Sequence, residues 1–294
     1  MHIRKSASRK VFEVCNYAVL TVVTLISLFP LVHMFALSFS SNSAAAAGWV
    51  TIFPVDFNLE SYKYILEKPE FFRAFGVSVI RVIIGTIINV GLTILCAYPM
   101  RQPDHKFRGR IFYVMMFLIT MVFIGGLIPT FLVVKAVGIY DTIWALVLPQ
   151  AVQVFNIILM LNFFRGLPPA LSESAFMDGA NHFQVMTRIY LPISKPSLAT
   201  VGLFTMVGHW NSWFDGMIYM KSPAKYPLQT YLRNVINAVD MASIDIHTAA
   251  SMAEISSRTL TAAQIFIAIL PILIVYPLLQ KYFIAGMTLG SVKE

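Results

Sequence analysis

The sequence predicts an all-α, polytopic membrane protein with six transmembrane helices and a short helical segment outside the membrane. The chain of 294 residues is 57% hydrophobic and only 12% charged, whereas ordinary globular domains carry roughly 25% charged residues. Its apolar residues gather in six runs, and each run reaches the length of about 20 residues that a helix needs to cross a bilayer. A polar stretch, 167–196, separates the fourth run from the fifth.

The first of the six runs differs from a signal peptide. The first is too long for the apolar region of a signal peptide and has no evident small-residue cleavage site, so we expect a retained membrane helix. The runs lie near residues 12–37, 74–99, 111–134, 143–163, 197–218 and 259–280.

Lys and Arg residues predict the orientation of these helices, because loops on the cytoplasmic side carry an excess of them. Most of the 22 Lys and Arg residues lie at the two termini, in the loop after the second run and in segment 167–196. We therefore expect both termini and this segment in the cytoplasm, and loops 39–73 and 219–258 outside. Much of the net charge of +8 is then a topology signal, not a sign of nucleic-acid binding.

Segment 167–196 has the pattern of two short helices joined by a tight turn. Pro168 and Pro169 favour the first turn of a helix, which we expect over 170–178. Gly179 suits the left-handed position after a helix end, and Asn181 can cap a second helix over 182–190. We expect proline to stop that second helix, at Pro192 and Pro196.

The first of these helices has a face suited to contact with another protein. Its charged and bulky residues recur at spacings that share one face, and these are Glu173, Phe176, Met177 and Ala180. Such a face fits a groove on a partner. A solvated amphipathic loop is the alternative and remains open. A DNA-binding helix-turn-helix fits less well, because the cluster of Arg, Lys and Asn that reads bases is missing.

The same segment resembles the cytoplasmic signature of the membrane subunits of binding-protein-dependent ABC importers. That pattern is Glu-Ala-Ala, three residues, Gly, nine residues, Ile, any residue and Leu-Pro. This chain has Glu173, Ser174, Ala175, Gly179, Ile189, Leu191 and Pro192 at those places. The one departure is Ser174, which replaces an alanine with another small residue.

The resemblance covers nearly the whole chain and is closest to the carbohydrate-importing branch, within it to permeases for complex oligosaccharides and polysaccharides. The stretches that carry it include "PTFLVVKAVGIYDTIWALVLP", "WNSWFDG", "KYPLQTYLR" and "QKYFIAGMTLGSVKE". It implies a single transmembrane domain of the type I importer kind over residues 1–294, in a bacterial inner membrane.

The family implies partners for this chain. These are a second permease subunit, often a different chain, two cytoplasmic ATPase subunits that bind ATP and Mg, an extracytoplasmic binding protein, membrane lipid and a saccharide. We call 167–196 the coupling segment, because in the family this region docks on the ATPase. Its residues with that implied role are Glu173, Ser174, Ala175, Phe176, Met177, Asp178, Gly179, Ile189, Leu191 and Pro192.

No residue pattern predicts catalysis, a metal site or a cofactor in this chain. A phosphate-binding loop needs Gly-Lys followed by Ser or Thr, and the sequence contains no Gly-Lys dipeptide. The two cysteines, Cys15 and Cys96, lie in or near apolar runs, and the six histidines are scattered. We therefore expect ATP hydrolysis in partner chains.

Polar residues within the runs are candidates for a substrate path, because they are costly in a membrane and tend to face a cavity. The candidates are Arg81, Asn89, Thr120, Gln153, Asn156, His209, Asn211, Ser212, Trp213 and Asp215. Aromatic rings interleaved with hydrogen-bonding groups suit sugars, and an Arg81 facing the cavity would favour an acidic sugar such as a uronate. The alternative is structural, since Asn and His also tie helices together.

Two other transporter classes remain as alternatives. A secondary transporter would need a buried ion or proton site and broken helices, but Asp215 has no obvious buried partner in the sequence. A permease for amino acids or peptides is the rival within the importer family.

Overall fold

The computed structural model describes residues 7–242 and 257–291, and within these ranges the chain is helical and contains no strand. The described residues divide into two compact units. One lies within Met1–Lys68 and Asn234–Leu270, and the other within Pro69–Arg233 and Pro271–Glu294. The expectation of a single transmembrane domain stays a prediction. Arg4, Lys5 and Lys293, which contributed to the predicted orientation, lie outside the described residues.

The first unit contains α1 (Ala7–Ser38), α2 (Asn42–Ala47), α3 (Glu60–Leu66) and the first part of α16 (Ser257–Ser291). Most side chains along α1 are apolar and exposed, as expected of a helix solvated by lipid. Hydroxyl groups join the helix ends. The Tyr62 hydroxyl donates to Ser38 Oγ over 2.8 Å, and Ser61 Oγ donates to Thr259 Oγ1 over 3.1 Å.

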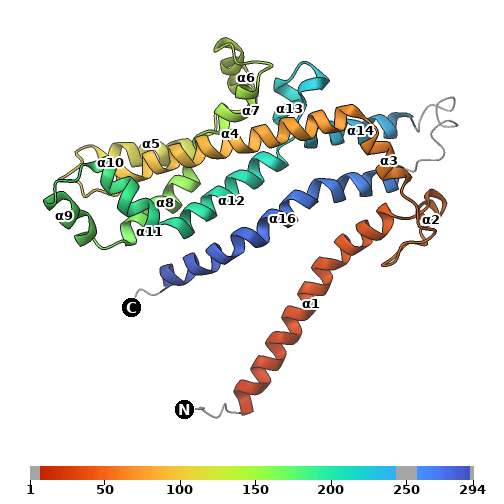
Figure 1. Ribbon diagram of the computed structural model, residues 1–294, viewed down its shortest axis with the longest axis horizontal. Helices are drawn as coiled ribbons and strands as arrows, with labels where there is room; N and C mark the ends of the chain where they lie inside the picture. Colours follow the sequence, from red (N-terminus) through yellow and green to blue (C-terminus); the bar gives the residue numbers. More distant parts are fainter. Residues whose placement is uncertain (1–6, 243–256, 292–294) are drawn as a thin grey trace. The chain divides into compact units, whose positions relative to one another are not determined.

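The second unit is built along α4 (Pro69–Met100), against which α8 (Val154–Gly166) and α12 (Lys195–Asn211) pack (Figure 1). Next to them lies α5 (Arg110–Val122). The core between these helices contains buried apolar residues from all parts of the bundle, among them Ala97, Ile157, Met160, Phe164, Tyr190 and Val201.

Shorter elements complete the second unit. They are α6 (Leu127–Ala136), α7 (Ile143–Val147), the 3-10 turn η1 (Leu148–Gln150), α13 (Phe214–Tyr219), the 3-10 turn η3 (Pro223–Lys225) and the start of α14 (Leu228–Ala242). Figure 1 shows α6, α7 and α13 on one side of α4, away from the end of the bundle that carries α9 (Ala170–Met177).

Three of the six predicted spans are continuous, and three are interrupted. Within the described residues three helices are long and apolar enough to cross a membrane, and up to five spans result if each of two bent helix pairs counts as one. The pair α5 and α6 bends by 115°, and the pair formed by α7 with η1 and by α8 bends by 51°. The fifth predicted span ends as a helix at Asn211, and α13 follows after a break.

Local sequence accounts for two of the three interruptions. The break between α5 and α6 contains Gly125 and Gly126, and Gly126 has a φ of +86°, which a residue with a Cβ rarely adopts. Pro149 ends the hydrogen-bonding pattern of α7 and lies in the first turn of η1. The pattern of apolar residues alone predicts each run as one continuous helix, because the residues on both sides of each break are apolar.

The coupling segment forms the predicted helix, turn and helix. The first helix is α9, Gly179 has a φ of +83°, and Asn181 caps α10 (His182–Val185) in a reciprocal capping box with Gln184. The bond from the Gln184 N–H to Asn181 Oδ1 is 2.9 Å long.

The predicted proline stops are wrong. After α10 the chain continues as a π turn, η2 (Met186–Tyr190), and then as α11 (Leu191–Ile193). Pro192 and Pro196 lie in the first turns of α11 and α12, where the missing N–H of proline costs no helical hydrogen bond. Each proline therefore begins a helix instead of ending one.

Candidate functional site

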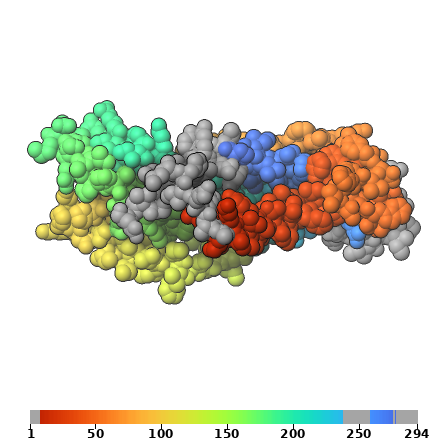
Figure 2. Space-filling model, turned by 90° about the horizontal axis from the view of Figure 1, so that it is seen from below, coloured from red at the N-terminus to blue at the C-terminus, as the bar shows by residue number. Residues whose placement is uncertain are grey.

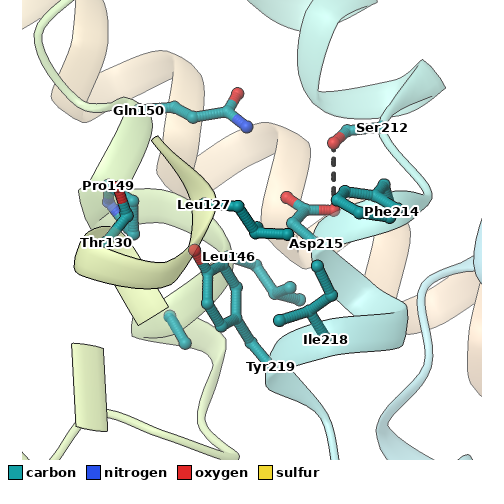
Figure 3. A pocket seen from close by; sticks show the side chains of 11 residues that line it. Leu127, Thr130, Leu146, Pro149, Gln150, Ser212, Phe214, Asp215, Ile218 and Tyr219 are labelled. Carbon is teal, nitrogen blue, oxygen red and sulfur yellow. Dashed lines mark hydrogen bonds between the residues drawn. The ribbon is translucent and has the colours of Figure 1, made fainter. Parts of the chain in front are cut away.

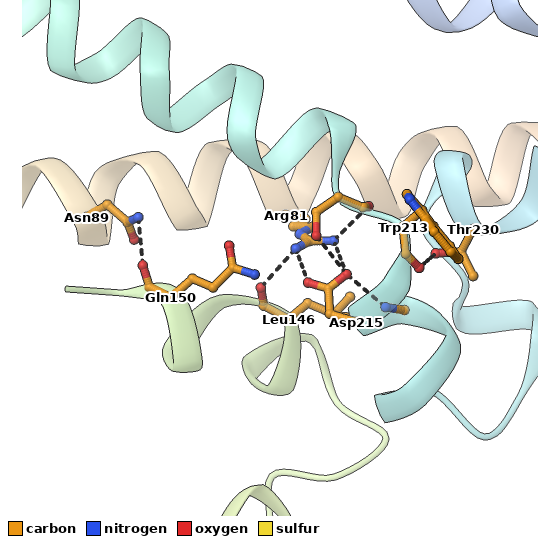
Figure 4. Close-up of polar contacts among 9 residues, drawn as sticks. Arg81, Asn89, Leu146, Gln150, Trp213, Asp215 and Thr230 are labelled. Atoms are coloured by element: carbon orange, nitrogen blue, oxygen red, sulfur yellow. Dashed lines mark hydrogen bonds and ion pairs between the residues drawn. The ribbon is translucent and has the colours of Figure 1, made fainter. Parts of the chain in front are cut away.

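A buried ion pair joins α4 to α13 at the level of the chain breaks. Arg81 is completely buried, and Asp215 is 8% exposed. Arg81 Nη1 donates to Asp215 Oδ1 over 3.1 Å, and Arg81 Nη2 donates to Asp215 Oδ2 (Figure 4). Two parallel N–H bonds to one carboxylate are the strongest geometry that this pair of side chains offers.

Backbone groups at the breaks complete the surroundings of the pair. Arg81 Nη1 also donates to the carbonyl of Ser212, and Nη2 donates to the carbonyl of Leu146, each over 3.3 Å. The Asp215 carboxylate accepts from the Ser212 hydroxyl over 2.9 Å and from the Gly216 N–H over 2.8 Å. Arg81 thus binds carbonyls that the interrupted helices leave without a helical partner.

A pocket of about 240 Å³ lies beside this ion pair. Its walls come from α6, from α7 with η1, and from α13 with Ser212 in front of it (Figure 3). The lining residues are Leu127, Thr130, Ala145, Leu146, Pro149, Gln150, Ser212, Phe214, Asp215, Ile218 and Tyr219. Sites that enclose a whole small molecule usually measure roughly 300–1,000 Å³, so this pocket is suited to part of a longer ligand.

Arg81 does not line this pocket, and its charge is balanced. The condition for a preference for acidic sugars, an Arg81 that faces the cavity, is therefore not met in this pocket, because Nη1 and Nη2 of Arg81 are bound to Asp215. The sequence-based statement that Asp215 has no obvious buried partner is wrong for the same reason. The two residues are 134 positions apart, so no local pattern connects them.

His209 lies one turn along α12 from the break and is 2% exposed. Its ring packs against Gly85 of α4, where an added Cβ would lie less than 3.0 Å from the ring atoms. Neither ring nitrogen has a hydrogen-bond partner among the described residues. His209 therefore fills the space between two helices and does not face the pocket.

Asn89 and Asn156 join neighbouring helices, which is the alternative to a role in the substrate path. Asn89 is completely buried and donates from Nδ2 to the carbonyl of Gln150 over 3.0 Å. Asn156 is 1% exposed and donates to Gln153 Oε1 over 2.7 Å and to Thr205 Oγ1 over 3.3 Å. These contacts hold α4, η1, α8 and α12 in register.

The remaining path candidates lie at the surface of the second unit. Asn211 and Thr120 are exposed, and the Thr120 hydroxyl donates to a carbonyl of its own helix. Trp213 is 38% exposed, and its carbonyl accepts from Thr230 Oγ1 over 2.7 Å. The guanidinium of Arg233 lies 5.5 Å from the centre of the Trp213 ring.

The structure thus brings Arg81, Ser212 and Asp215 together beside the pocket, and His209, Asn89, Asn156 and Trp213 do not line it. Sequence reasoning missed Thr130, Gln150 and Tyr219, which supply much of the polar lining of the pocket. The sequence signal for them is the pair Gly125 and Gly126 together with Pro149, which interrupts the apolar runs. Irregular backbone lies at membrane depth only where it lines a cavity or is buried in protein, so such interruptions point to a cavity.

The coupling segment presents two different surfaces. Glu173 is exposed and Met177 is 87% exposed, so both are accessible to a partner. Phe176 is half-buried instead, because its ring packs on His182 with 4.8 Å between centroids. The predicted common face of Glu173, Phe176 and Met177 is therefore divided between the outside and the protein's own core.

The other signature residues are divided in the same way. Ser174, Asp178, Gly179 and Pro192 are exposed, whereas Ala175, Ile189 and Leu191 pack on the helical core. Among the described residues no group of three or more His, Cys, Asp or Glu is arranged to hold a metal ion.

Comparison with known proteins places this arrangement in a family. A family model described as "Binding-protein-dependent transport system inner membrane component" matches residues 89–289. Protein LplC of Bacillus subtilis (strain 168) is 42% identical over 293 residues, which cover 100% of this chain and 98% of LplC. The polygalacturonan/rhamnogalacturonan transport system permease protein YtcP of the same organism is 36% identical over 284 residues, which cover 97% of this chain and 99% of YtcP.

A solved structure has the same fold. A chain in the crystal structure of a bacterial ABC transporter involved in the import of the acidic polysaccharide alginate superposes with a TM-score of 0.85. The two chains are 32% identical, and the match covers 96% of this chain and 99% of the other.

Proposed function

Because the chain belongs to the family of inner membrane components of binding-protein-dependent transport systems, we propose that it is the permease subunit of an ATP-driven importer of oligo- or polysaccharides. The observation that carries the proposal is the match along almost the entire chain to a chain of the alginate importer, with a TM-score of 0.85. YtcP, with 36% identity, is named as a permease of a polygalacturonan/rhamnogalacturonan transport system.

The substrate that we propose is an acidic saccharide. Alginate and polygalacturonan, which the names of two similar proteins mention, both carry carboxylate groups. Within the described residues the cation best placed for a carboxylate is Arg233, which is exposed and lies over the Trp213 ring. An aromatic face next to a guanidinium suits a sugar ring that bears a carboxylate.

The partners follow from the family and from the exposed surfaces. We propose two ATPase chains, which bind ATP and Mg, and which contact Glu173 and Met177 of the coupling segment. A second permease and an extracytoplasmic binding protein complete the transporter. Both termini then lie in the cytoplasm, and the pocket beside Asp215 takes part of the saccharide as it passes.

The test is uptake by vesicles that contain the complete transporter, with its binding protein and a labelled oligogalacturonide. We expect uptake only when hydrolysable ATP is present on the side of the ATPases. A protonophore should leave that uptake unchanged. Uptake that continues without ATP and stops when the protonophore is added would instead establish a secondary transporter, and uptake of peptides but not of any saccharide would establish the rival permease class.

A further inference from the structure

The end of the second unit that carries the coupling segment contains an open groove of about 690 Å³. In Figure 2 the green surface of the coupling segment and the yellow surface that follows α4 meet at this end. The lining residues come from the end of α4, from the loop after it, and from α9, α10 and η2: Leu95, Tyr98, Pro99, Gln102, Lys106, Phe107, Phe176, His182, Phe183 and Met186.

The groove is apolar along its length and cationic at one edge. Leu95 and Phe183 are exposed apolar residues, with 56% and 67% of their surface accessible. Lys106 is exposed at the edge, and among the described residues no carboxylate lies within ion-pair distance of it. The carboxylate of Asp104 in the same loop is bound to Arg110 Nε over 2.7 Å.

A second positive group lies next to the groove with unused donors. The guanidinium of Arg101 is stacked between two rings, 4.7 Å from the centre of Tyr98 and 3.9 Å from the centre of Tyr190. Its Nε and Nη2 atoms are buried and have no hydrogen-bond partner within the described part of the chain. Arg101 does not line the groove, so it adds positive charge beside the groove without binding an occupant directly.

The position of the groove limits its occupant. Leu95, Tyr98 and Pro99 belong to the last turns of α4, a helix that is long and apolar enough to cross a membrane. The groove therefore lies close to the level at which α4 leaves the hydrocarbon region. An occupant there needs an apolar part for the walls and an anionic part for Lys106.

We infer that the groove binds an anionic phospholipid. Its acyl chain lies along Leu95 and Phe183, and its phosphate accepts hydrogen bonds from Lys106 at the edge of the groove. Basic pockets beside membrane helices are sites for anionic headgroups. The exposed Met177 and Glu173 do not line the groove, so the lipid and the proposed ATPase partner contact different surfaces of the coupling segment.

The test compares two charge reversals in the same loop of the complete transporter. Complexes are reconstituted in nanodiscs that contain phosphatidylcholine and phosphatidylglycerol, and the lipids retained after transfer to detergent are counted by native mass spectrometry. We expect Lys106→Glu to lose bound phosphatidylglycerol about fivefold or more, since each cation near the surface contributes about that factor. Arg108→Glu is the matched control, because Arg108 is exposed in the same loop but does not line the groove.

Equal retention of phosphatidylglycerol in Lys106→Glu and the unmodified complex would overturn the inference. Equal losses in both loop variants would also overturn it, because they would show only a general attraction of charge. A second measurement places a photoreactive benzoyl group on the ring at position 183. Cross-linking to phosphatidylglycerol supports the site, whereas cross-linking to a partner chain in place of lipid shows that the groove is a protein interface.

Discussion

Gly85 of α4 lies against the imidazole ring of His209 of α12, in a space that leaves no room for a Cβ at position 85. Close approach of two membrane helices depends on such small residues. Gly85 is one turn from Arg81, and His209 is close to the break that precedes Asp215. The spacing of α4 and α12 at this contact therefore also determines whether the buried ion pair can form.

We predict that Gly85→Ala lowers the stability of the assembled complex. An added methyl group in a packed interior costs about 1–3 kcal/mol, and here the neighbouring atoms belong to a buried ring. The measurement is the temperature at which the purified complex unfolds. Gly91→Ala is the control, because Gly91 lies on the same helix with no heavy atom near its missing Cβ; an equal shift in both variants would contradict the close-packing argument.

Removal of one partner of the Arg81 and Asp215 pair should be more harmful than removal of both. A single change such as Asp215→Leu leaves a buried charge without a partner, which costs about 3–5 kcal/mol. The double variant Arg81→Met/Asp215→Leu removes both charges and should recover part of the folded yield. Thermal unfolding of the four proteins in a double-mutant cycle measures the coupling, and additive effects would show that the pair contributes no specific stabilisation.

Gly179→Leu should reduce uptake while the complex remains folded. The φ of +83° at this position penalises a side chain, by about 1 kcal/mol or more, and no neighbouring atom would be displaced. The effect therefore acts on the shape of the turn after α9. Uptake and substrate-stimulated ATP hydrolysis are measured per folded complex.

The control for this change is Gly166→Leu, at an exposed glycine that has a helical backbone and open space around it. Normal uptake in Gly179→Leu, or equal losses in both variants, would argue against a special role for the turn. Glu173→Ala removes the exposed charge of α9 and should also weaken stimulation of the ATPase.

Trp213→Ala and Arg233→Gln should affect acidic and neutral saccharides differently. Loss of the Trp213 ring should weaken the uptake of both kinds of saccharide, by a factor that corresponds to about 1 kcal/mol of interaction free energy. Loss of the guanidinium should weaken only the uptake of the acidic saccharide, and added salt should diminish that difference. Lys221→Gln is the control, as another exposed cation that follows α13. Equal discrimination in Arg233→Gln and the unmodified transporter would exclude this pair from substrate selection.

The loop between α6 and α7 should loosen in acid. The Lys225 side chain, together with the backbone N–H of Lys221, holds the pKa of Asp141 below its ordinary value. Lys225 Nζ lies 2.6 Å from Asp141 Oδ2. Because the pKa is lower in the folded protein, this contact stabilises the loop at pH values above the ordinary pKa of about 4. The stabilisation is lost as the pH falls through the folded pKa.

Hydrogen exchange of the 138–143 loop at several pH values measures this loss. In Asp141→Asn the acid-dependent part of the exchange rate should disappear, because the amide does not titrate. Asn also tolerates the positive φ of 61° at this position, so the backbone conformation should persist. A pH profile that is the same with Asp and with Asn would show that another group is responsible.

The sequence was sufficient to predict the apolar runs and the turns that single residues determine. Gly179 adopts the left-handed conformation, and Asn181 caps the following helix, because each effect depends on that residue and its immediate neighbours. The proline stops failed for a related reason. Proline lacks an N–H and its ring clashes with the preceding turn, but neither effect matters in the first turn of a helix. Pro192 and Pro196 are therefore compatible with helices that begin just before them.

The pocket and the ion pair could not be predicted from local sequence patterns. Arg81 and Asp215 were both candidates, but only tertiary packing brings α4 to α13. Gln150 and Tyr219 line the pocket because three apolar runs are interrupted at one level. Apolar composition predicts membrane insertion well, yet it does not distinguish a straight helix from two short ones.

The pairing of Arg81 with Asp215 also determines how this region responds to voltage. One elementary charge that moves through a potential of 100 mV gains or loses about 2.3 kcal/mol. A guanidinium bound to a carboxylate has no net charge, so the two move through the field without electrical work. A rearrangement of α4 and α13 that keeps this contact is therefore insensitive to the membrane potential. The free energy that drives such a rearrangement must come from another part of the assembly.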